Sequence, residues 1–198
     1  MELGKNLHIK KLNLPNYSLS EELLNAITHG IGSLLSVIAV IVLIQKYKGH
    51  TADLVFMLIY CFTLFLLYTI STLYHSLKRN KAKEVFRKLD HCSIFLLIAG
   101  TYTPICAAIL KTNFAFCVLA GVWILGIVGI VFNAIDVNKF SKFSLTCYIL
   151  MGWSIVFIAH PTIKILNREQ LLYLLIGGIF YTVGAIIYVI GKKIKYMH

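Results

Sequence analysis

Long apolar runs alternate with short polar segments along the whole chain. Each run is about 20 residues long, which is what a helix needs to cross the hydrocarbon core of a bilayer at a rise of about 1.5 Å per residue. Lipid offers the backbone no hydrogen-bond partners, so each run must satisfy its own polar groups by forming a helix. The pattern predicts six transmembrane helices, at about residues 23–44, 54–77, 92–110, 114–135, 143–161 and 171–190.

The connections between these runs are short, which predicts that successive helices are antiparallel neighbours in one all-α membrane domain spanning residues 1–198. Residues 1–20 form a polar N-terminal segment, and Ser20 followed by Glu22 predicts the start of the first helix. Residues 191–198 are basic and resemble a loop that leads into another helix. We therefore expect a seven-helix bundle whose last helix lies beyond this sequence.

Composition favours a membrane protein and excludes a soluble globular domain. Hydrophobic residues make up 59% of the 198 residues, and the mean hydropathy is +0.80. Charged residues make up 14%, well below the roughly 25% usual for globular chains. The formal net charge of +11 would suggest a nucleic-acid partner in a soluble protein. Here the basic residues flank the apolar runs, so we expect contacts with anionic membrane lipids and none with nucleic acid.

Basic residues are distributed unequally between the two sides of the predicted bundle. One side, formed by the N-terminal segment, the second and fourth connections and the C-terminal segment, carries 14 of them: Lys5, Lys10, Lys11, Lys78, Arg79, Lys81, Lys83, Arg87, Lys88, Lys139, Lys142, Lys192, Lys193 and Lys195. The other side carries five: Lys46, Lys48, Lys111, Lys164 and Arg168. Short loops rich in Lys and Arg stay in the cytoplasm. The distribution predicts a multi-pass protein of the cell membrane with a cytoplasmic N-terminus.

Polar and ionisable side chains gather toward the cytoplasmic ends of the predicted spans. Ser71 and His75 are four residues apart near the inner end of the second span, so they share a helix face. Asp90 is expected to open the third span at the same end, and His29 lies in the first turns of the first span. His198 would stand at the inner end of a further helix. Ionisable groups in membrane segments are costly, so this cluster is a candidate functional site.

The residue types in this cluster suit a metal site. Zinc binds neutral imidazole nitrogens, and a catalytic zinc keeps one position for water. A nearby carboxylate such as Asp90 can hold or deprotonate that water. Two simpler interpretations remain open at this point. A histidine near a helix end is often an amphipathic interfacial residue, and Asp90 alone could cap the third span.

Three stretches together carry a resemblance to a known family. They are residues 21–30 (EELLNAITHG), residues 71–75 (STLYH) and residues 90–104 (DHCSIFLLIAGTYTP). In order and at similar spacings, they resemble the hemolysin III family, which is grouped with the progestin and adipoQ receptors and so with the adiponectin receptors. The resemblance covers essentially the whole chain. It implies a seven-helix bundle with the N-terminus inside and a zinc ion near the cytoplasmic face.

The same resemblance assigns roles to individual residues. It implies that zinc is held by the histidine of the SxxxH motif, here His75, and by two histidines of an HxxxH motif at the start of helix seven. His198 matches the first histidine of that second motif, and the second would lie beyond this sequence. The resemblance implies that Asp90 lies near the zinc-bound water and that Ser71 supports the site. His29 is a further candidate member of the cluster.

Three functional hypotheses from different classes follow. The first is a zinc-dependent membrane hydrolase that acts on a lipid amide or ester, with Asp90 and Ser71 as the catalytic residues and His75 and His198 as metal ligands. The second is a pore-forming cytolysin or channel, which the name of the hemolysin III family suggests. The third is a ligand-responsive membrane sensor without turnover. The sequence specifies neither the substrate nor the oligomeric state.

Overall fold

The computed structural model describes residue 12 and residues 14–191, and every regular element in this part of the chain is a helix. Six helical stretches are long and apolar enough to cross a membrane, which confirms the six predicted spans. The protein is a multi-pass α-helical membrane protein. Its elements are α1 (Leu19–Lys46), α2 (Thr51–Ser76), α3 (Lys81–Thr103), the π-helix η1 (Pro104–Leu110), α4 (Asn113–Asp136), α5 (Ser141–Trp153), the 3₁₀-helix η2 (Ser154–Ile158), α6 (Ala159–Ile165) and α7 (Arg168–Gly191).

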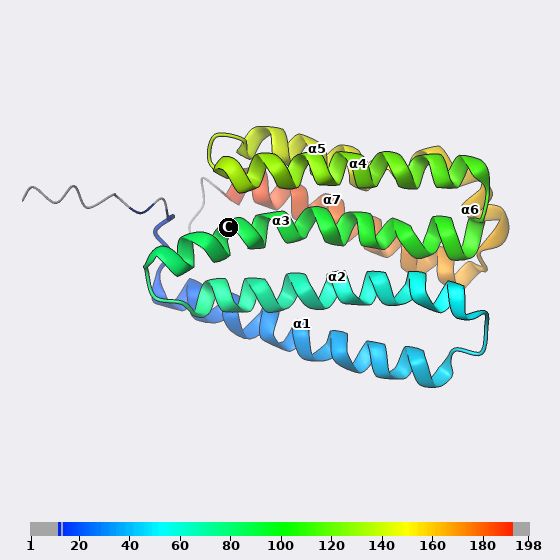
Figure 1. Ribbon diagram of the computed structural model, residues 1–198, viewed down its shortest axis with the longest axis horizontal. Helices are drawn as coiled ribbons and strands as arrows, with labels where there is room; N and C mark the ends of the chain where they lie inside the picture. Colours follow the sequence, from blue (N-terminus) through cyan, green and yellow to red (C-terminus); the bar gives the residue numbers. More distant parts are fainter. Residues whose placement is uncertain (1–11, 13, 192–198) are drawn as a thin grey trace, which may run out of the picture.

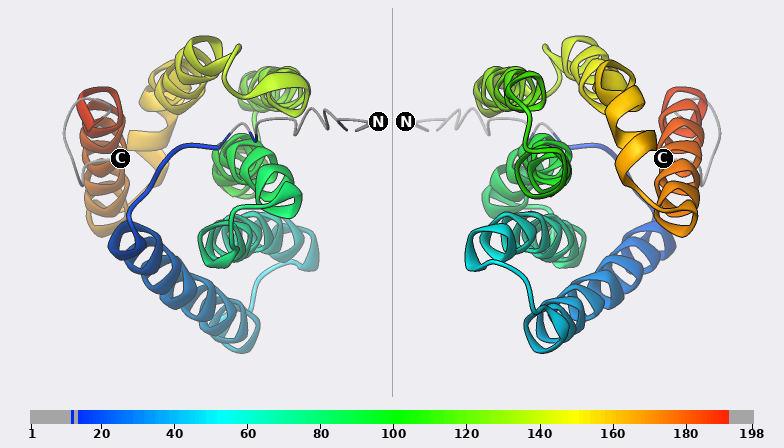
Figure 2. Two further views of the ribbon diagram at one scale, coloured as in Figure 1. Left: turned by 90° about the vertical axis from the view of Figure 1, so that its left-hand side faces the viewer. Right: turned by 90° about the vertical axis from the view of Figure 1, so that its right-hand side faces the viewer.

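Successive spans run in opposite directions along the bundle, with α5, η2 and α6 together forming one span (Figure 1). Viewed from either end, they follow one another around the bundle in chain order, from α1 to α7 (Figure 2). α3 packs against both α2 and α4 and carries much of the buried core. Phe95 and Ala99 of α3 pack there with Val122 of α4 and Met151 of α5. The buried core is therefore built mainly around α3.

α7 is attached more sparsely than the other long helices and packs mainly against α5. The Tyr181 hydroxyl of α7 donates a hydrogen bond of 2.6 Å to the backbone carbonyl of Tyr148. An apolar groove of about 240 Å³ lies between the two helices, and Ile149, Trp153 and Ile186 contribute to its lining. No residue in the most apolar part of α7 is buried. Most of its side chains are therefore left uncovered by the residues that the structure describes.

The first helix begins slightly earlier than the sequence pattern predicts. Ser18, rather than Ser20, is the N-cap residue of α1. The Ser18 hydroxyl accepts a hydrogen bond of 3.4 Å from the backbone N–H of Glu21, and the Glu21 carboxylate accepts one of 2.7 Å from the backbone N–H of Ser18. This reciprocal arrangement is a capping box, which satisfies two N–H groups that the helix itself leaves unpaired.

The third span begins well before residue 92, so the prediction that Asp90 opens it is wrong. α3 starts at Lys81, and the side chain of Asn80 caps it by accepting a hydrogen bond of 2.9 Å from the backbone N–H of Lys83. The apolar run marks only the part of the helix inside the hydrocarbon, whereas the helix itself continues through a charged segment. Asp90 consequently lies inside α3 and does not cap it.

Two spans change their helix type at or near a proline. Pro104 follows the last residue of α3 and begins the π-helix η1. Pro161 lies in α6, four residues after Phe157 of the 3₁₀-helix η2. A proline lacks an N–H and crowds the carbonyl four residues before it, so a regular α-helix cannot continue through it undisturbed. Local π and 3₁₀ segments are common responses to this strain.

Glycines allow two pairs of neighbouring helices to approach closely, as small residues often do in membrane bundles. Gly100 of α3 lies against Thr63 of α2, and Gly129 of α4 lies against the ring of Phe95 of α3. A Cβ atom at Gly129 would overlap the Phe95 ring, and Phe95 is fully buried. The contact between α3 and α4 therefore depends on the absence of a side chain at position 129.

We expect Gly129→Ala to destabilise the bundle by about 1–3 kcal/mol, the usual cost of overpacking a core. The melting temperature of the purified protein in detergent measures the effect. Gly121→Ala is the matched control, because Gly121 lies on the same helix and a Cβ there would meet no atom within 4 Å. Alanine is the better helix former, so this control should be neutral or slightly stabilising. Equal melting temperatures for the two variants would show that the contact between Gly129 and Phe95 is not tight.

One end of the bundle, on the left in Figure 1, contains the start of α1 and two connections: the one between α2 and α3 and the one between α4 and α5. From the excess of basic residues on these segments, we predict that this end is cytoplasmic. Green fluorescent protein fused after Asn80 should fluoresce, and alkaline phosphatase fused after Asn167 should be active. The reverse pattern, with active phosphatase at Asn80, would invert the topology.

Candidate functional site

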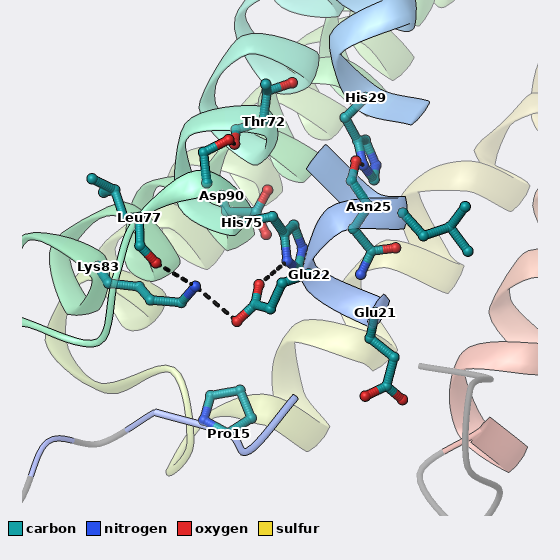
Figure 3. Close-up of polar contacts among 12 residues, drawn as sticks. Pro15, Glu21, Glu22, Asn25, His29, Thr72, His75, Leu77, Lys83 and Asp90 are labelled. Atoms are coloured by element: carbon teal, nitrogen blue, oxygen red, sulfur yellow. Dashed lines mark hydrogen bonds and ion pairs between the residues drawn. The ribbon is translucent and has the colours of Figure 1, made fainter. Parts of the chain in front are cut away.

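Polar side chains from α1, α2 and α3 meet at this same end of the bundle (Figure 3). α1 contributes Glu22 and His29 from its first turns, α2 contributes His75 from its last turn, and α3 contributes Lys83 and Asp90. Antiparallel packing explains the convergence, because the start of α1, the end of α2 and the start of α3 lie at one level. We refer to these five residues together with Ser71 as the inner cluster.

His75 lies at the centre of the inner cluster and is held by Glu22. The distance from Nδ1 of His75 to Oε2 of Glu22 is 2.7 Å, and the His75 side chain is 8% exposed. An ionised carboxylate has no hydrogen to donate, so the imidazole carries its proton on Nδ1. In the neutral ring, Nε2 then keeps a lone pair. His75 can therefore bind an electrophile or accept a hydrogen bond through Nε2.

The second carboxylate oxygen of Glu22 pairs with a buried lysine. Nζ of Lys83 lies 2.7 Å from Oε1 of Glu22 and donates a hydrogen bond of 2.9 Å to the backbone carbonyl of Leu77. The ammonium group also lies 5.1 Å from the centre of the Tyr74 ring. Lys83 is only 3% exposed, and burial of an unpaired ammonium would be very costly. Two polar partners and one aromatic ring therefore compensate for the burial of this charge.

His29 lies beside His75 on the neighbouring helix. The two rings are stacked, with centroids 6.2 Å apart and planes inclined by 14°. Nδ1 of His29 lies 2.8 Å from the backbone carbonyl of Asn25, which can only accept a hydrogen bond, so the proton of the neutral ring is again on Nδ1. In their neutral forms, both histidines would therefore keep a lone pair on Nε2. The two rings thus share the same hydrogen-bonded nitrogen, Nδ1, although the partner of His29 is a backbone carbonyl and that of His75 is a carboxylate.

Asp90 and Ser71 complete the inner cluster. Asp90 is close enough to His75 for its charge to act on the imidazole. Ser71 is buried one helical turn before His75. The cluster thus combines two imidazoles, a carboxylate that is not needed to hold them, and a hydroxyl. Such a set can bind a cation or move a proton.

The N-terminal segment packs beside His75 through Tyr17. The ring of Tyr17 lies 5.8 Å from the His75 ring, centroid to centroid. Burial raises the pKa of the Tyr17 phenol above its ordinary value of 10, so this phenol stays neutral at physiological pH. Arg79 fixes the segment by donating hydrogen bonds of 2.6 Å and 3.3 Å to the backbone carbonyls of Pro15 and Leu14.

One polar atom next to the inner cluster lacks a partner. Tyr74 is 2% exposed, and its hydroxyl makes no hydrogen bond among the residues that the structure describes. A buried hydroxyl without a partner costs about 1–3 kcal/mol. Tyr74 precedes His75 and packs against it, with ring centroids 4.6 Å apart.

The structure brings His29, Ser71, His75 and Asp90 to one end of the bundle, as the topology argument predicts. His198 lies outside the described residues. Within residues 12 and 14–191, no group of three or more His, Cys, Asp and Glu side chains is arranged to hold a metal ion. The role of these residues in binding metal therefore stays a prediction.

Sequence reasoning missed the parts that Glu22 and Lys83 play. Glu22 was interpreted as a helix-start residue, and Lys83 as a loop charge that only sets topology. One signal could have identified Glu22: it precedes Asn25 by three residues and His29 by seven, which places all three on one helix face. Nothing in the sequence marks Lys83 as buried, because it is surrounded by other basic residues.

Comparisons with known proteins agree with the fold. The family model described as "Haemolysin-III related" matches residues 17–196. Hemolysin-3 of Bacillus cereus is 41% identical over 191 residues, which cover 96% of this chain and 87% of that protein. The Hemolysin-3 homolog of Bacillus subtilis (strain 168) is 41% identical over 184 residues, which cover 92% of this chain and 86% of that protein. These matches include the inner cluster and extend over nearly the whole chain, which belongs to the haemolysin III-related family of membrane proteins.

Proposed function

We propose that this protein is a membrane-embedded zinc hydrolase that cleaves an amide or ester bond of a membrane lipid. One observation carries the proposal. His29 and His75 each hold Nδ1 in a hydrogen bond to an oxygen atom and so keep Nε2 for a ligand, beside the carboxylate of Asp90. Catalytic zinc is typically bound by imidazole nitrogens and carboxylates and keeps a position for water. A histidine that donates its other N–H to a carboxylate is the usual arrangement around such a metal.

The chemistry of the donor set fits zinc, although the described residues alone do not complete a site. His75 would supply one nitrogen ligand, and His198, outside the described residues, would supply a second. A histidine expected beyond this sequence would supply the third, and His29 is a further candidate ligand. Zinc bound there would polarise a carbonyl oxygen and lower the pKa of a bound water to about 7. Asp90 is left for chemistry because Glu22 already holds His75.

Three residues of the inner cluster then have defined tasks in the reaction. The Asp90 carboxylate accepts the proton of the water that attacks the substrate carbonyl, and it returns that proton to the leaving nitrogen or oxygen. Glu22 keeps the His75 ring in place through Nδ1. The Ser71 hydroxyl, buried one turn before His75, is a hydrogen-bonding group for the site.

A lipid is the substrate that fits the location. The inner cluster lies at the ends of three helices that are long and apolar enough to span the membrane. At this depth a bilayer changes from acyl chains to headgroups, and the amide and ester bonds of lipids lie at that boundary. A soluble substrate would have to pass the segment that Tyr17 and Arg79 hold across His75.

Metal removal tests the proposal directly. The purified protein, reconstituted in vesicles with lipids that carry amide or ester bonds, should release fatty acid. A zinc chelator should abolish the release, and added zinc should restore it, because the attacking water has no activator without the metal. Mass spectrometry of the lipids measures the product. Undiminished release after complete removal of the metal would contradict the proposal.

The same vesicles test the competing function. Two relatives carry the name hemolysin, which describes membrane damage, so this chain could instead permeabilise membranes. Leakage of an entrapped dye without any lipid product would favour a pore. Lipid product without leakage supports the hydrolase.

A further inference from the structure

We propose that Glu22 is a positioning residue that fixes the ring orientation and tautomer of His75, and that Lys83 is the buried counter-charge that makes this possible. The inference rests on the proposed function only in calling His75 a metal ligand. The contacts of Glu22 with His75 and Lys83 do not depend on that function. They connect the first turn of α1, the last turn of α2 and the first turn of α3 (Figure 3).

Glu22 divides its two oxygens between two tasks. Oε2 holds Nδ1 of His75, and Oε1 holds Nζ of Lys83, each at 2.7 Å. If Glu22 served only to neutralise Lys83, its second oxygen would not need to contact the imidazole of His75. The hydrogen bond to Nδ1 fixes which nitrogen of the neutral ring carries the proton, and it restrains rotation of the ring about the Cβ–Cγ bond. The lone pair on Nε2 is thereby directed to one place.

Lys83 explains how a carboxylate can lie in this position. Glu22 is 17% exposed and Lys83 is 4% exposed at their side chains, so both charges have left most of their water. Burial of such a pair rarely gains stability over apolar residues of similar size, so its presence needs another reason. Lys83 also binds the Leu77 carbonyl at the end of α2, where the helix dipole favours a positive charge. Lys83 thus links the Glu22 carboxylate to the C-terminal end of α2, which also carries His75.

Outer partners of metal-bound histidines typically contribute 10- to 100-fold in metal affinity. We therefore expect Glu22→Gln to weaken zinc binding by about 10- to 100-fold. The glutamine retains the size of Glu22 and one acceptor oxygen, but it loses the charge that holds the imidazole N–H. Competition with a fluorescent zinc chelator measures the affinity.

A double variant separates positioning from simple structural support. Glu22→Gln or Lys83→Met alone leaves one buried charge or polar group without its partner, which destabilises the fold. The combination of both substitutions removes both charges, so its melting temperature without metal should return close to that of the wild type. Its zinc affinity should remain about 10- to 100-fold lower, because the carboxylate is still missing. Recovery of both stability and affinity in the double variant would overturn the proposal.

The matched control is an ion pair at the other end of the bundle. Lys111 donates a hydrogen bond of 2.8 Å to Asp53, near the start of α2. Asp53→Asn removes a carboxylate from a pair of similar distance that lies far from His75. We expect it to leave zinc affinity unchanged. A loss as large as that of Glu22→Gln would overturn the proposal, because it would show that zinc affinity follows general stability.

A measurement without metal keeps the inference separate from the proposed function. Nitrogen NMR of ¹⁵N-histidine in metal-free protein reports which ring nitrogen is protonated, and a His75→Gln variant assigns the signal. The wild type should show a single His75 tautomer with the proton on Nδ1, and Glu22→Ala should show a mixture. This result would uphold the positioning role even if the wild type bound no zinc, which would contradict only the proposed function. An unchanged His75 signal in Glu22→Ala would overturn the inference.

Discussion

Replacing His75 with alanine should remove most of the zinc from the purified protein. The wild type, purified without chelator, should carry about one zinc per chain, as a single catalytic site does. His75 is the histidine that Glu22 orients in the inner cluster, and loss of one of about three protein ligands leaves too few bonds to offset the hydration of the metal. Elemental analysis by mass spectrometry measures the metal content of both proteins.

A second histidine variant controls for general effects of the substitution. His160 is exposed and belongs to α6, at the opposite end of the bundle from His75. His160→Ala should retain the zinc content of the wild type. Equal zinc in the wild type and in His75→Ala would remove His75 from the site.

Replacing Asp90 with asparagine should reduce the rate of lipid hydrolysis by about 10²- to 10⁴-fold, the usual contribution of a general base. Asparagine keeps the size of the side chain but lacks the negative charge and the proton acceptor. Asp90 lies near His75 without being the group that holds it, so zinc content should change little. The rate of fatty-acid release from vesicles, measured with zinc in excess, reports the effect.

Asp136 provides a matched carboxylate at the same end of the bundle. Its side chain accepts hydrogen bonds from the backbone N–H groups of Asn138 and Lys139, which an asparagine can also accept. Asp136→Asn should therefore retain full activity. Equal hydrolysis by the wild type and Asp90→Asn would exclude Asp90 as the base, whether or not zinc is bound.

The spans were predictable because they depend on a local property. A run of about 20 apolar residues is sufficient to specify a membrane helix. Five of the six predicted runs lie within helical stretches of the structure, and the run at 54–77 extends one residue beyond the end of α2. The ends were less predictable. α3 begins at Lys81 because a capping side chain, Asn80, and a charged helical segment extend it beyond the apolar run. Hydropathy does not detect such an extension.

The candidate site was predictable in its depth but not in its contacts. Alternation of helix direction is enough to bring His29, His75 and Asp90 to one end. The pairing of Glu22 with His75 depends on how α1 is rotated about its axis against α2, which the apolar pattern of a helix surrounded by lipid does not determine. Lys83 was counted with the topology-setting basic residues, and only packing reveals that it is buried. The metal roles of His75 and His198 remain predictions.

The sparse attachment of α7 has a mechanical consequence. Lipid chains are as apolar as the side chains of this helix, so α7 gains little by leaving lipid for α5. The hydrogen bond from Tyr181 to the Tyr148 carbonyl is then one of the few contacts that resist its sideways displacement. A displacement of this kind would widen the groove between α5 and α7 without disturbing the packing around Phe95. Among the described residues, the bundle thus combines a tightly packed core at α3 with a sparsely attached helix at α7.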